Sequence, residues 1–206
     1  MVDQRSATHP RQEMGAARLE GFSDAVLAVI ITITALELRP PSSADLAALQ
    51  PLIPGLLIYV LSFTVIGIYW NNHHHLLRAT RRISGGVMWA NLYLLFWLSL
   101  VPVITAWVGA HPRDLWPAVI YGADGFMAGI AYAILTQTIR KVNKDTSINE
   151  LLQRDAKAKV SVALIALGMA LAFIEPLLAY GAYALVSLMW FIPDRRLATT
   201  GAKQEG

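Results

Sequence analysis

Six apolar stretches alternate with shorter polar segments along the chain. They cover about residues 22–38, 51–70, 85–109, 115–139, 160–174 and 177–192. A helix needs about 20 residues to cross a bilayer, and these stretches lack the period-2 alternation of membrane β-barrel strands. We therefore predict an all-α membrane protein with six transmembrane helices per subunit. The last two stretches are short, and they fit two short or oblique helices better than a partly re-entrant hairpin.

The basic residues predict the orientation of these helices. Of the 17 Lys and Arg, all but Arg39 and Arg113 fall in the N-terminal region, in residues 71–84 and 140–159, or near the C-terminus. Loops rich in Lys and Arg stay in the cytoplasm, so both termini are expected there. The predicted domains are a polar, disordered cytoplasmic tail (1–17), one six-helix transmembrane domain (18–193) and a cytoplasmic C-terminal tail (194–206).

The composition agrees with a membrane protein and excludes several other classes. Hydrophobic residues make up 55% of the chain and charged residues 15%, against about 25% charged residues in soluble domains. This composition argues against a nucleic-acid-binding module in spite of the net charge of +3. The chain has no Cys, which excludes disulfides and thiolate metal sites. No phosphate-binding glycine motif or nucleophile motif occurs, so nothing indicates an enzyme or a cofactor.

The first apolar stretch carries a stripe and a separate polar corner. At 100° per residue, a set of residues falls within about 60° of one line: Arg18, Phe22, Ala25, Val29, Thr32, Ile33 and Leu36. Ser23 and Asp24 lie more than about 100° from that line. An ionisable residue inside a span marks a site or a specific partner. Asp24 is interpreted as a hydrogen-bonding residue between helices, and a proton or ion ligand is the alternative.

A second polar cluster ends the second stretch and comprises Trp70, Asn71, Asn72, His73, His74 and His75. Consecutive His side chains on a helix point about 100° apart, so they do not converge on one metal ion. We expect one or two of them to pair with the Asp24 corner, joined by Asn91, and we expect no metal site.

Three other carboxylates lie within or beside the apolar stretches, and two of them, Asp124 and Glu37, allow two interpretations each. Asp124, between Gly122 and Gly125, is favoured as a structural carboxylate with satisfied hydrogen bonds over a transport residue. Glu175 precedes Pro176 in a tight turn, where it is expected to touch water. Glu37 either concentrates cations at the outer mouth of a pore or is simply exposed.

The residues from Arg18 to Asp24 read R-x-x-x-F-S-D. This motif resembles the signature of the endolysosomal (transmembrane protein 175-type) potassium channel family, in its six-helix prokaryotic branch. Further similarities are Ser62-Phe63, Trp70 followed by His73-His74, and Asn91 followed by Leu100-Val101-Pro102. The resemblance covers about residues 18–110 and rests mainly on hydropathy beyond them.

The resemblance implies a potassium-permeable channel without a P-loop filter, in the inner membrane of a prokaryote. Its pore is lined by the first helix of each of four subunits, so a homotetramer is expected, with potassium and other monovalent cations as permeant species. In the family, the positions of Val29, Thr32 and Leu36 face the pore. Val29 is smaller than the Leu or Ile usual there, which implies a wider constriction.

The roles implied for individual residues follow from the chemistry of their side chains. Val29, Ile33 and Leu36 would form an apolar gate that closes by excluding water, and Thr32 would give modest selectivity. The remaining motif residues would hold the first helix against the second and third: Arg18, Phe22, Ser23, Asp24, Trp70, His73, His74 and Asn91. Two rival classes stay open, a proton-coupled transporter that uses Asp24 or Asp124 and a non-conducting membrane assembly protein.

Overall fold

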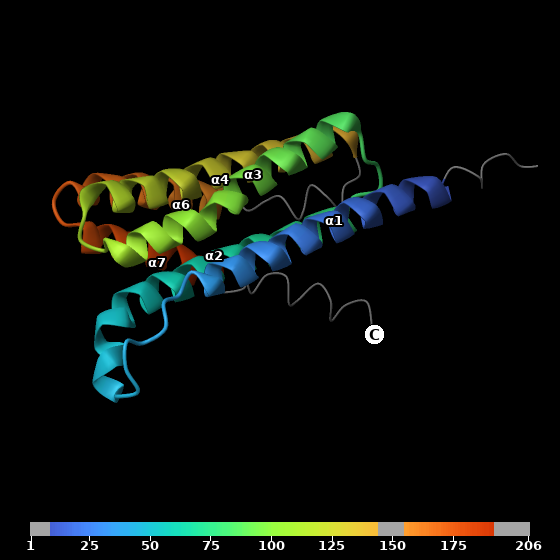
Figure 1. Ribbon diagram of the computed structural model, residues 1–206. Helices are drawn as coiled ribbons and strands as arrows, with labels where there is room; N and C mark the ends of the chain where they lie inside the picture. The colour runs from blue at the N-terminus through green and yellow to red at the C-terminus, as the bar shows by residue number, and fades with distance from the viewer. Residues whose placement is uncertain (1–8, 144–154, 192–206) are drawn as a thin grey trace, which may run out of the picture.

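The computed structural model describes residues 9–143 and 155–191, and every element of regular structure over those residues is helical. The elements are α1 (His9–Leu36), the 3-10 helix η1 (Leu46–Leu52), α2 (Ile53–Arg78), α3 (Gly85–Ala110), α4 (Leu115–Val142), α6 (Asp155–Ala172) and α7 (Pro176–Phe191). Figure 1 shows that the α-helices lie alongside one another in an elongated bundle, with η1 at one end. The prediction of an all-α protein is confirmed for the described residues.

Each α-helix in the described part of the chain overlaps one of the six apolar stretches. Four segments are long and apolar enough to cross a membrane, namely Gly15–Leu36, Leu46–Arg78, Gly85–Ala110 and Leu115–Val142. The apolar helix α7 is shorter. The structure therefore supports a multi-pass membrane protein.

The start of α1 differs from the prediction. The helix begins at His9, so the expectation of a disordered tail up to residue 17 is wrong from residue 9 onward. The sequence from Gln12 to Ala17 is rich in strong helix formers, namely Gln, Glu, Met and Ala, which allows the helix to extend beyond its apolar part. Residues 1–8 and 192–206 lie outside the described residues, and so do the parts of the two predicted tails that fall there.

The helices pack in two groups that share α4. Helix α1 packs against α2 and α3, α3 packs against α4, and α6 packs against α7 and α4. The larger apolar core lies between α1, α2, α3 and α4, with Leu27, Ile66, Leu94 and Leu135 fully or almost fully buried in it. A second core joins α2, α3, α4, α6 and α7 around Val108 and Ala118. One face of α1 thus contributes to a core, whereas the other is left outside it.

Polar contacts fix the register of the central helices. The Ser62 hydroxyl of α2 lies 2.7 Å from the Thr105 hydroxyl of α3 and 3.0 Å from the Tyr121 hydroxyl of α4. Asn143, at the end of α4, accepts hydrogen bonds from the backbone N–H groups of Arg81 and Arg82 in the turn between α2 and α3. Such interhelical hydrogen bonds hold membrane helices together where packing alone gives no hydrophobic gain.

Candidate functional site

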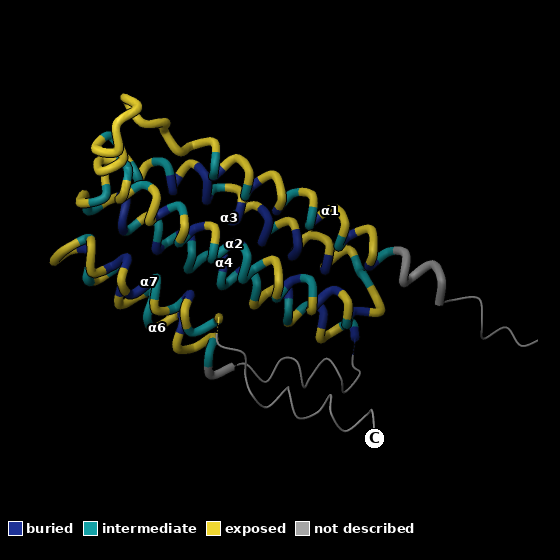
Figure 2. Tube along the Cα trace, turned by 90° about the horizontal axis from the view of Figure 1, so that it is seen from below, coloured by how far each residue is buried: buried dark blue, intermediate teal, exposed yellow. Residues whose placement is uncertain are grey.

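Helix α1 presents two faces of different character. Its buried face is formed by Leu19, Ser23, Leu27, Ile30 and Thr34. The residues of the predicted stripe are all exposed in the subunit: Arg18, Phe22, Ala25, Val29, Thr32, Ile33 and Leu36. Figure 2 shows exposed segments on successive turns of α1. Leu36 is 81% exposed and Val29 is 54% exposed. A mostly apolar exposed stripe along a helix that packs mainly against α2 and α3 indicates contact with lipid or with another subunit.

A groove of about 550 Å³ follows this stripe along α3. Its wall combines Phe22, Val29 and Ile33 of α1 with Pro102 and Val103 of α3. Glu37 also lines the groove and is exposed, so it lies at the end of the stripe, where both interpretations of this residue placed it.

The two threonines of α1 have different surroundings. The exposed Thr32 hydroxyl donates to the carbonyl oxygen of Val29 at 2.9 Å. The buried Thr34 hydroxyl donates to the carbonyl oxygen of Ile30 at 2.7 Å. A hydroxyl that donates its proton still has two lone pairs as acceptors. Thr32 therefore presents an oxygen that can accept a hydrogen bond or face a cation, whereas Thr34 is buried within the subunit.

A buried chain of hydrogen bonds joins α1, α2 and α3. His73 Nε2 lies 2.7 Å from Asn91 Oδ1, and Asn91 Nδ2 donates to Ser23 Oγ at 2.9 Å. Ser23 in turn donates to the carbonyl oxygen of Leu19 at 2.8 Å. His73, Asn91 and Ser23 are at most 1% exposed. Each of the three helices supplies one side chain to this series of hydrogen bonds. The series therefore fixes the rotation of α1 about its own axis.

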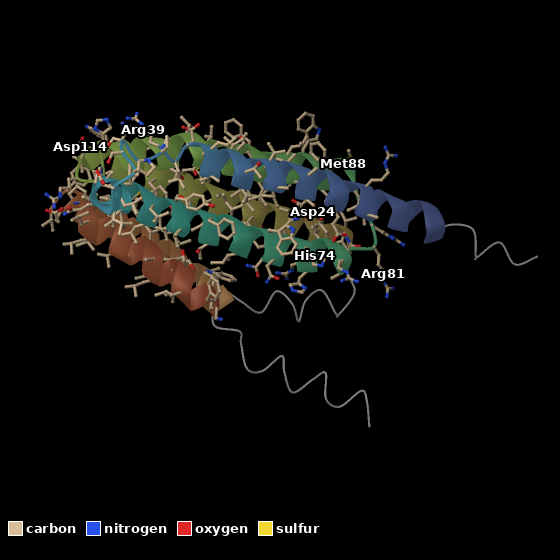
Figure 3. All side chains as sticks on the ribbon, turned by 60° about the horizontal axis from the view of Figure 1, so that its bottom comes forward. Asp24, Arg39, His74, Arg81, Met88 and Asp114 are labelled. Carbon is tan, nitrogen blue, oxygen red and sulfur yellow. The ribbon has the colours of Figure 1, made fainter. Side chains whose placement is uncertain are left out.

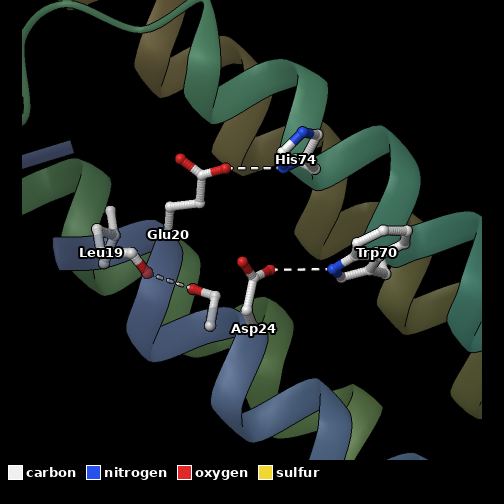
Figure 4. A network of polar contacts seen from close by, with 6 residues as sticks. Leu19, Glu20, Asp24, Trp70 and His74 are labelled. Atoms are coloured by element: carbon white, nitrogen blue, oxygen red, sulfur yellow. Dashed lines mark hydrogen bonds and ion pairs between the residues drawn. The ribbon is translucent and has the colours of Figure 1, made fainter. Parts of the chain in front are cut away.

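Two contacts at the side of this chain link α1 to α2 (Figure 4). The Trp70 indole N–H donates to Asp24 Oδ1 at 3.1 Å, and His74 Nδ1 lies 2.7 Å from Glu20 Oε1. Asp24 is thus bonded to Trp70, whereas His74, which lies beside it, pairs with Glu20. Glu20 was missed, although its position one turn before Asp24 puts both on the same helix face.

The three consecutive His side chains take three directions, as their spacing predicts. His73 is buried against Asn91, and His74 faces Glu20 and stacks on Trp70 with ring centres 5.8 Å apart. His75 is exposed. They therefore do not form a common metal site.

A different set of possible metal ligands does meet at one point. The ligand atoms of Glu20, Asp24 and His74 all lie within 4.8 Å of one another. In the structure, Glu20 pairs with His74, and Asp24 accepts a hydrogen bond from Trp70. Glu20, Asp24 and His74 therefore serve as links between α1 and α2.

The expected role of Arg18 in the corner is wrong in the subunit. Arg18 is exposed, and the structure gives it no hydrogen bond or ion pair with a described residue. The reason is geometric, because 100° per residue aligns position 18 with Phe22 and Val29 and not with Ser23. Arg18 therefore belongs to the exposed stripe, at its basic end.

The structure agrees with the prediction for Glu175 but not with the prediction for Asp124. Asp124 is 7% exposed, and its Oδ1 atom has no hydrogen-bond partner among the described residues. The expectation of a satisfied structural carboxylate is therefore wrong, because no donor side chain of the neighbouring helices reaches this oxygen. Glu175 is exposed, as expected, and its Oε1 accepts from the N–H of Leu177 at 3.4 Å, at the start of α7.

The side chains that link α1 to α2 and α3, namely Glu20, Ser23, Asp24, Trp70, His73, His74 and Asn91, form an anchoring network. This network lies near the basic end of the bundle. Figure 3 shows Asp24 and His74 toward the end that carries Arg81, with Arg39 and Asp114 at the opposite end. The described ends of α2 and α4 add Arg78, Arg140 and Lys141. This distribution agrees with the asymmetry that the sequence predicts.

Comparisons with known proteins agree with this arrangement. The family model described as endosomal/lysosomal potassium channel TMEM175 matches residues 18–102, which include α2, most of α3 and α1 from Arg18. The chain is 45% identical over 185 residues to a potassium channel of Chryseobacterium sp., a match that covers 89% of this chain and 96% of that protein. It is 30% identical over 128 residues to a potassium channel of Streptomyces collinus, covering 60% of this chain and 62% of that protein.

The fold has a counterpart among solved structures. A crystal structure of a lysosomal potassium-selective channel TMEM175 homolog from Chamaesiphon minutus matches with a TM-score of 0.76 at 24% identity. The match covers 86% of this chain and 96% of that one, and at this identity it shows a shared fold. Together with the relative from Chryseobacterium sp., which matches over nearly its whole length, these similarities show that the chain belongs to the prokaryotic branch of the endosomal/lysosomal potassium channel TMEM175 family.

Proposed function

We propose that the protein is a potassium-permeable cation channel, a homotetramer whose pore is lined by α1 of each subunit. The observation that carries this proposal is the exposed stripe of α1, with Val29, Thr32, Ile33 and Leu36 on one line. A single copy of α1 encloses no pore, so several copies have to face a common axis. The names of the relatives from Chryseobacterium sp. and Streptomyces collinus support potassium as the permeant ion.

The side chains of the stripe divide into two roles. Val29, Ile33 and Leu36 are apolar and have no group that binds a cation, so they act as a gate by narrowing the pore and excluding water. Rings formed by Val29, Thr32 and Leu36 are three to four residues apart, which is about 4.5–6 Å along the axis. Thr32 forms the layer between the outer two, and its oxygen replaces part of the hydration shell of an ion.

The buried hydrogen bonds behind α1 support this assignment. Ser23 and Asp24 face α2 and α3, so the polar corner is engaged within the subunit and is directed away from the stripe. A helix held in this way keeps the same residues toward the axis in each subunit. Asp24 is accordingly a positioning residue and not an ion ligand.

The membrane topology of the proposal has six spans with both termini in the cytoplasm. The four long apolar segments supply spans by length and hydropathy, and α6 and α7 form a helix pair that supplies the remaining two. The basic residues at the end that carries Arg81 and Arg140 place this end in the cytoplasm by the positive-inside rule. The protein then resides in the inner membrane of a prokaryote.

A second candidate function is a proton-coupled transporter. The observation that favours it is Asp124, a buried carboxylate whose Oδ1 has no hydrogen-bond partner among the described residues. Intramembrane carboxylates of this kind serve proton relays in transporters.

Recordings from the purified protein in planar bilayers separate these functions. A channel gives discrete single-channel current steps, and its reversal potential with potassium on one side and sodium on the other reports selectivity. The proposal predicts unitary steps and a modest preference for potassium. Flux that saturates without unitary steps and disappears in Asp124→Asn would identify a transporter, and the absence of any flux would indicate an assembly protein.

A further inference from the structure

A large cavity lies on the side of the subunit that α1 does not occupy. It has a volume of about 1260 Å³ and lies between α2, α4, α6 and α7. Small-molecule pockets usually measure roughly 300–1,000 Å³. The wall is mostly apolar and includes Val65, Ile68, Phe126, Ile130, Ile165 and Val186. These properties require an occupant with an extended apolar part.

The cavity has a strongly basic mouth. Arg140 and Lys141 at the end of α4 and Lys159 near the start of α6 line it and are exposed. Among the described residues that line the cavity, Asp124 is the only acidic one. It lies 16 positions before Arg140 on α4, which is about 24 Å along the helix axis. The positive charge at the mouth is therefore not neutralised by the wall of the cavity.

We propose that this cavity binds an anionic phospholipid from the leaflet at the basic end of the bundle. Its phosphate lies between Arg140, Lys141 and Lys159, and its acyl chains lie against the apolar wall. Basic pockets between transmembrane helices bind anionic headgroups in this way. Trp190 also lines the cavity, with its indole N–H bonded to Ser161 Oγ at 2.9 Å, and Trp is typical of the level where headgroups lie.

The lipid occupies the basic half of the cavity, whose lining on α4 runs from Tyr121 to Lys141, about 30 Å along the helix axis. The hydrocarbon of one leaflet is about 15 Å thick, half of the roughly 30 Å core of a bilayer. A chain anchored at Arg140 therefore ends before Asp124, and the buried carboxyl does not contact it. The proposal needs a chain embedded in a membrane, and it does not depend on ion conduction.

Native mass spectrometry of the detergent-solubilised protein, titrated with phosphatidylglycerol or phosphatidylcholine, tests this site. The double variant Arg140→Gln/Lys159→Gln removes two charges from the mouth, and Arg78→Gln/Arg82→Gln removes two charges at the same end outside the cavity. At about 1 kcal/mol per basic residue, phosphatidylglycerol should bind the first variant roughly thirtyfold more weakly than the wild type. The control variant should bind it like the wild type, and phosphatidylcholine should bind all three weakly.

Two further arms separate a lipid from other occupants. Ala133 lines the cavity, is exposed and lies seven positions before Arg140, about 10.5 Å along α4, so Ala133→Leu places a larger side chain where the acyl chains lie and should also weaken phosphatidylglycerol binding. Glycerol 1-phosphate, which has the headgroup charge without acyl chains, should not displace the lipid. Equal phosphatidylglycerol affinity of wild type and Arg140→Gln/Lys159→Gln would overturn the proposal, as would displacement by glycerol 1-phosphate, which would indicate a site for free phosphate.

Discussion

Thr32 and Thr34 are two residues apart on α1, yet only one of them is available to an ion. Both hydroxyls donate to a carbonyl of their own helix, a common arrangement for Thr in membrane helices. Thr34 is 1% exposed, whereas Thr32 is on the exposed stripe. The same residue type therefore has a structural role at one position and a proposed functional role at the other.

Replacement of each threonine by the isosteric valine tests this difference. Thr32→Val removes a layer of hydroxyls from the proposed pore, so we expect the potassium-to-sodium permeability ratio to fall, by about fivefold if the layer contributes about 1 kcal/mol. Thr34→Val removes a hydroxyl that is buried within the subunit and should leave the ratio unchanged. Reversal potentials under bi-ionic conditions measure both ratios, and an unchanged ratio in Thr32→Val would remove Thr32 from the selectivity mechanism.

Asn91 connects the three helices of the anchoring network, so its loss should be costly. Asn91→Leu has a similar volume but leaves His73 Nε2 and Ser23 Oγ without their buried partner. Each unsatisfied group costs about 1–3 kcal/mol, so we expect a clear drop in thermal stability in detergent. Asn71→Leu makes the same change at an exposed position of α2 and serves as the control. Equal melting temperatures for the two variants would contradict a role of Asn91 in stability.

Much of this site was predictable at the residue scale because it depends on angular spacing. The stripe, the separation of Ser23 from it and the divergence of the three His all follow from 100° per residue. The partners were harder to predict. Glu20 meets His74 only because α1 and α2 cross at a particular height, and the missing partner of Asp124 depends on which donors the neighbouring helices supply. Neither property is contained in the spacing along one helix.

At the element scale, α4 shows how small residues set the distance between helices. A Cβ on Gly122 would collide with the Tyr183 hydroxyl and with Met169, so α4 approaches α6 and α7 closely at this point. Gly125, one turn further along, has open space around it. The apolar stretches predicted the helices, whereas these close approaches depend on tertiary structure and were not predicted.

The pair Gly122→Ala and Gly125→Ala tests this close approach within one helix. Ala is favoured over Gly in a helix by about 1 kcal/mol, so Gly125→Ala should leave stability unchanged or raise it slightly. Gly122→Ala has to displace the buried Tyr183 side chain, which donates a hydrogen bond to the carbonyl oxygen of Ala118. We expect it to lower the melting temperature, by an amount typical of overpacking at about 1–3 kcal/mol. An increase in both variants would show that α4, α6 and α7 pack more loosely than described.

At the scale of the whole molecule, the exposed face of α1 is the feature that one subunit leaves without a partner. Exposed segments recur on successive turns of α1 in Figure 2, although the same helix is central to the family resemblance. The groove along α3 adds further apolar surface next to it. Assembly around an axis covers this surface and encloses a path at the same time.

The mass of the assembled protein follows from this arrangement. In nanodiscs, the protein should have about four times the 22.6 kDa mass of one chain. A conducting monomer or dimer, measured by native mass spectrometry on the same sample used for recordings, would contradict the assembly. Native mass spectrometry therefore gives the number of subunits without any measurement of ion selectivity.

The most direct test of the central claim uses the absence of Cys from the chain. Single cysteines at Thr32 and at Leu36 of α1, and at the exposed apolar Leu185 of α7 as the control, are exposed to a thiol-reactive quaternary ammonium during current recording. The account predicts that Thr32→Cys and Leu36→Cys lose nearly all of their potassium current, because a fixed positive charge in a narrow pore repels cations. The Leu185→Cys variant should keep its current. Unchanged currents through both α1 variants would contradict a pore lined by α1.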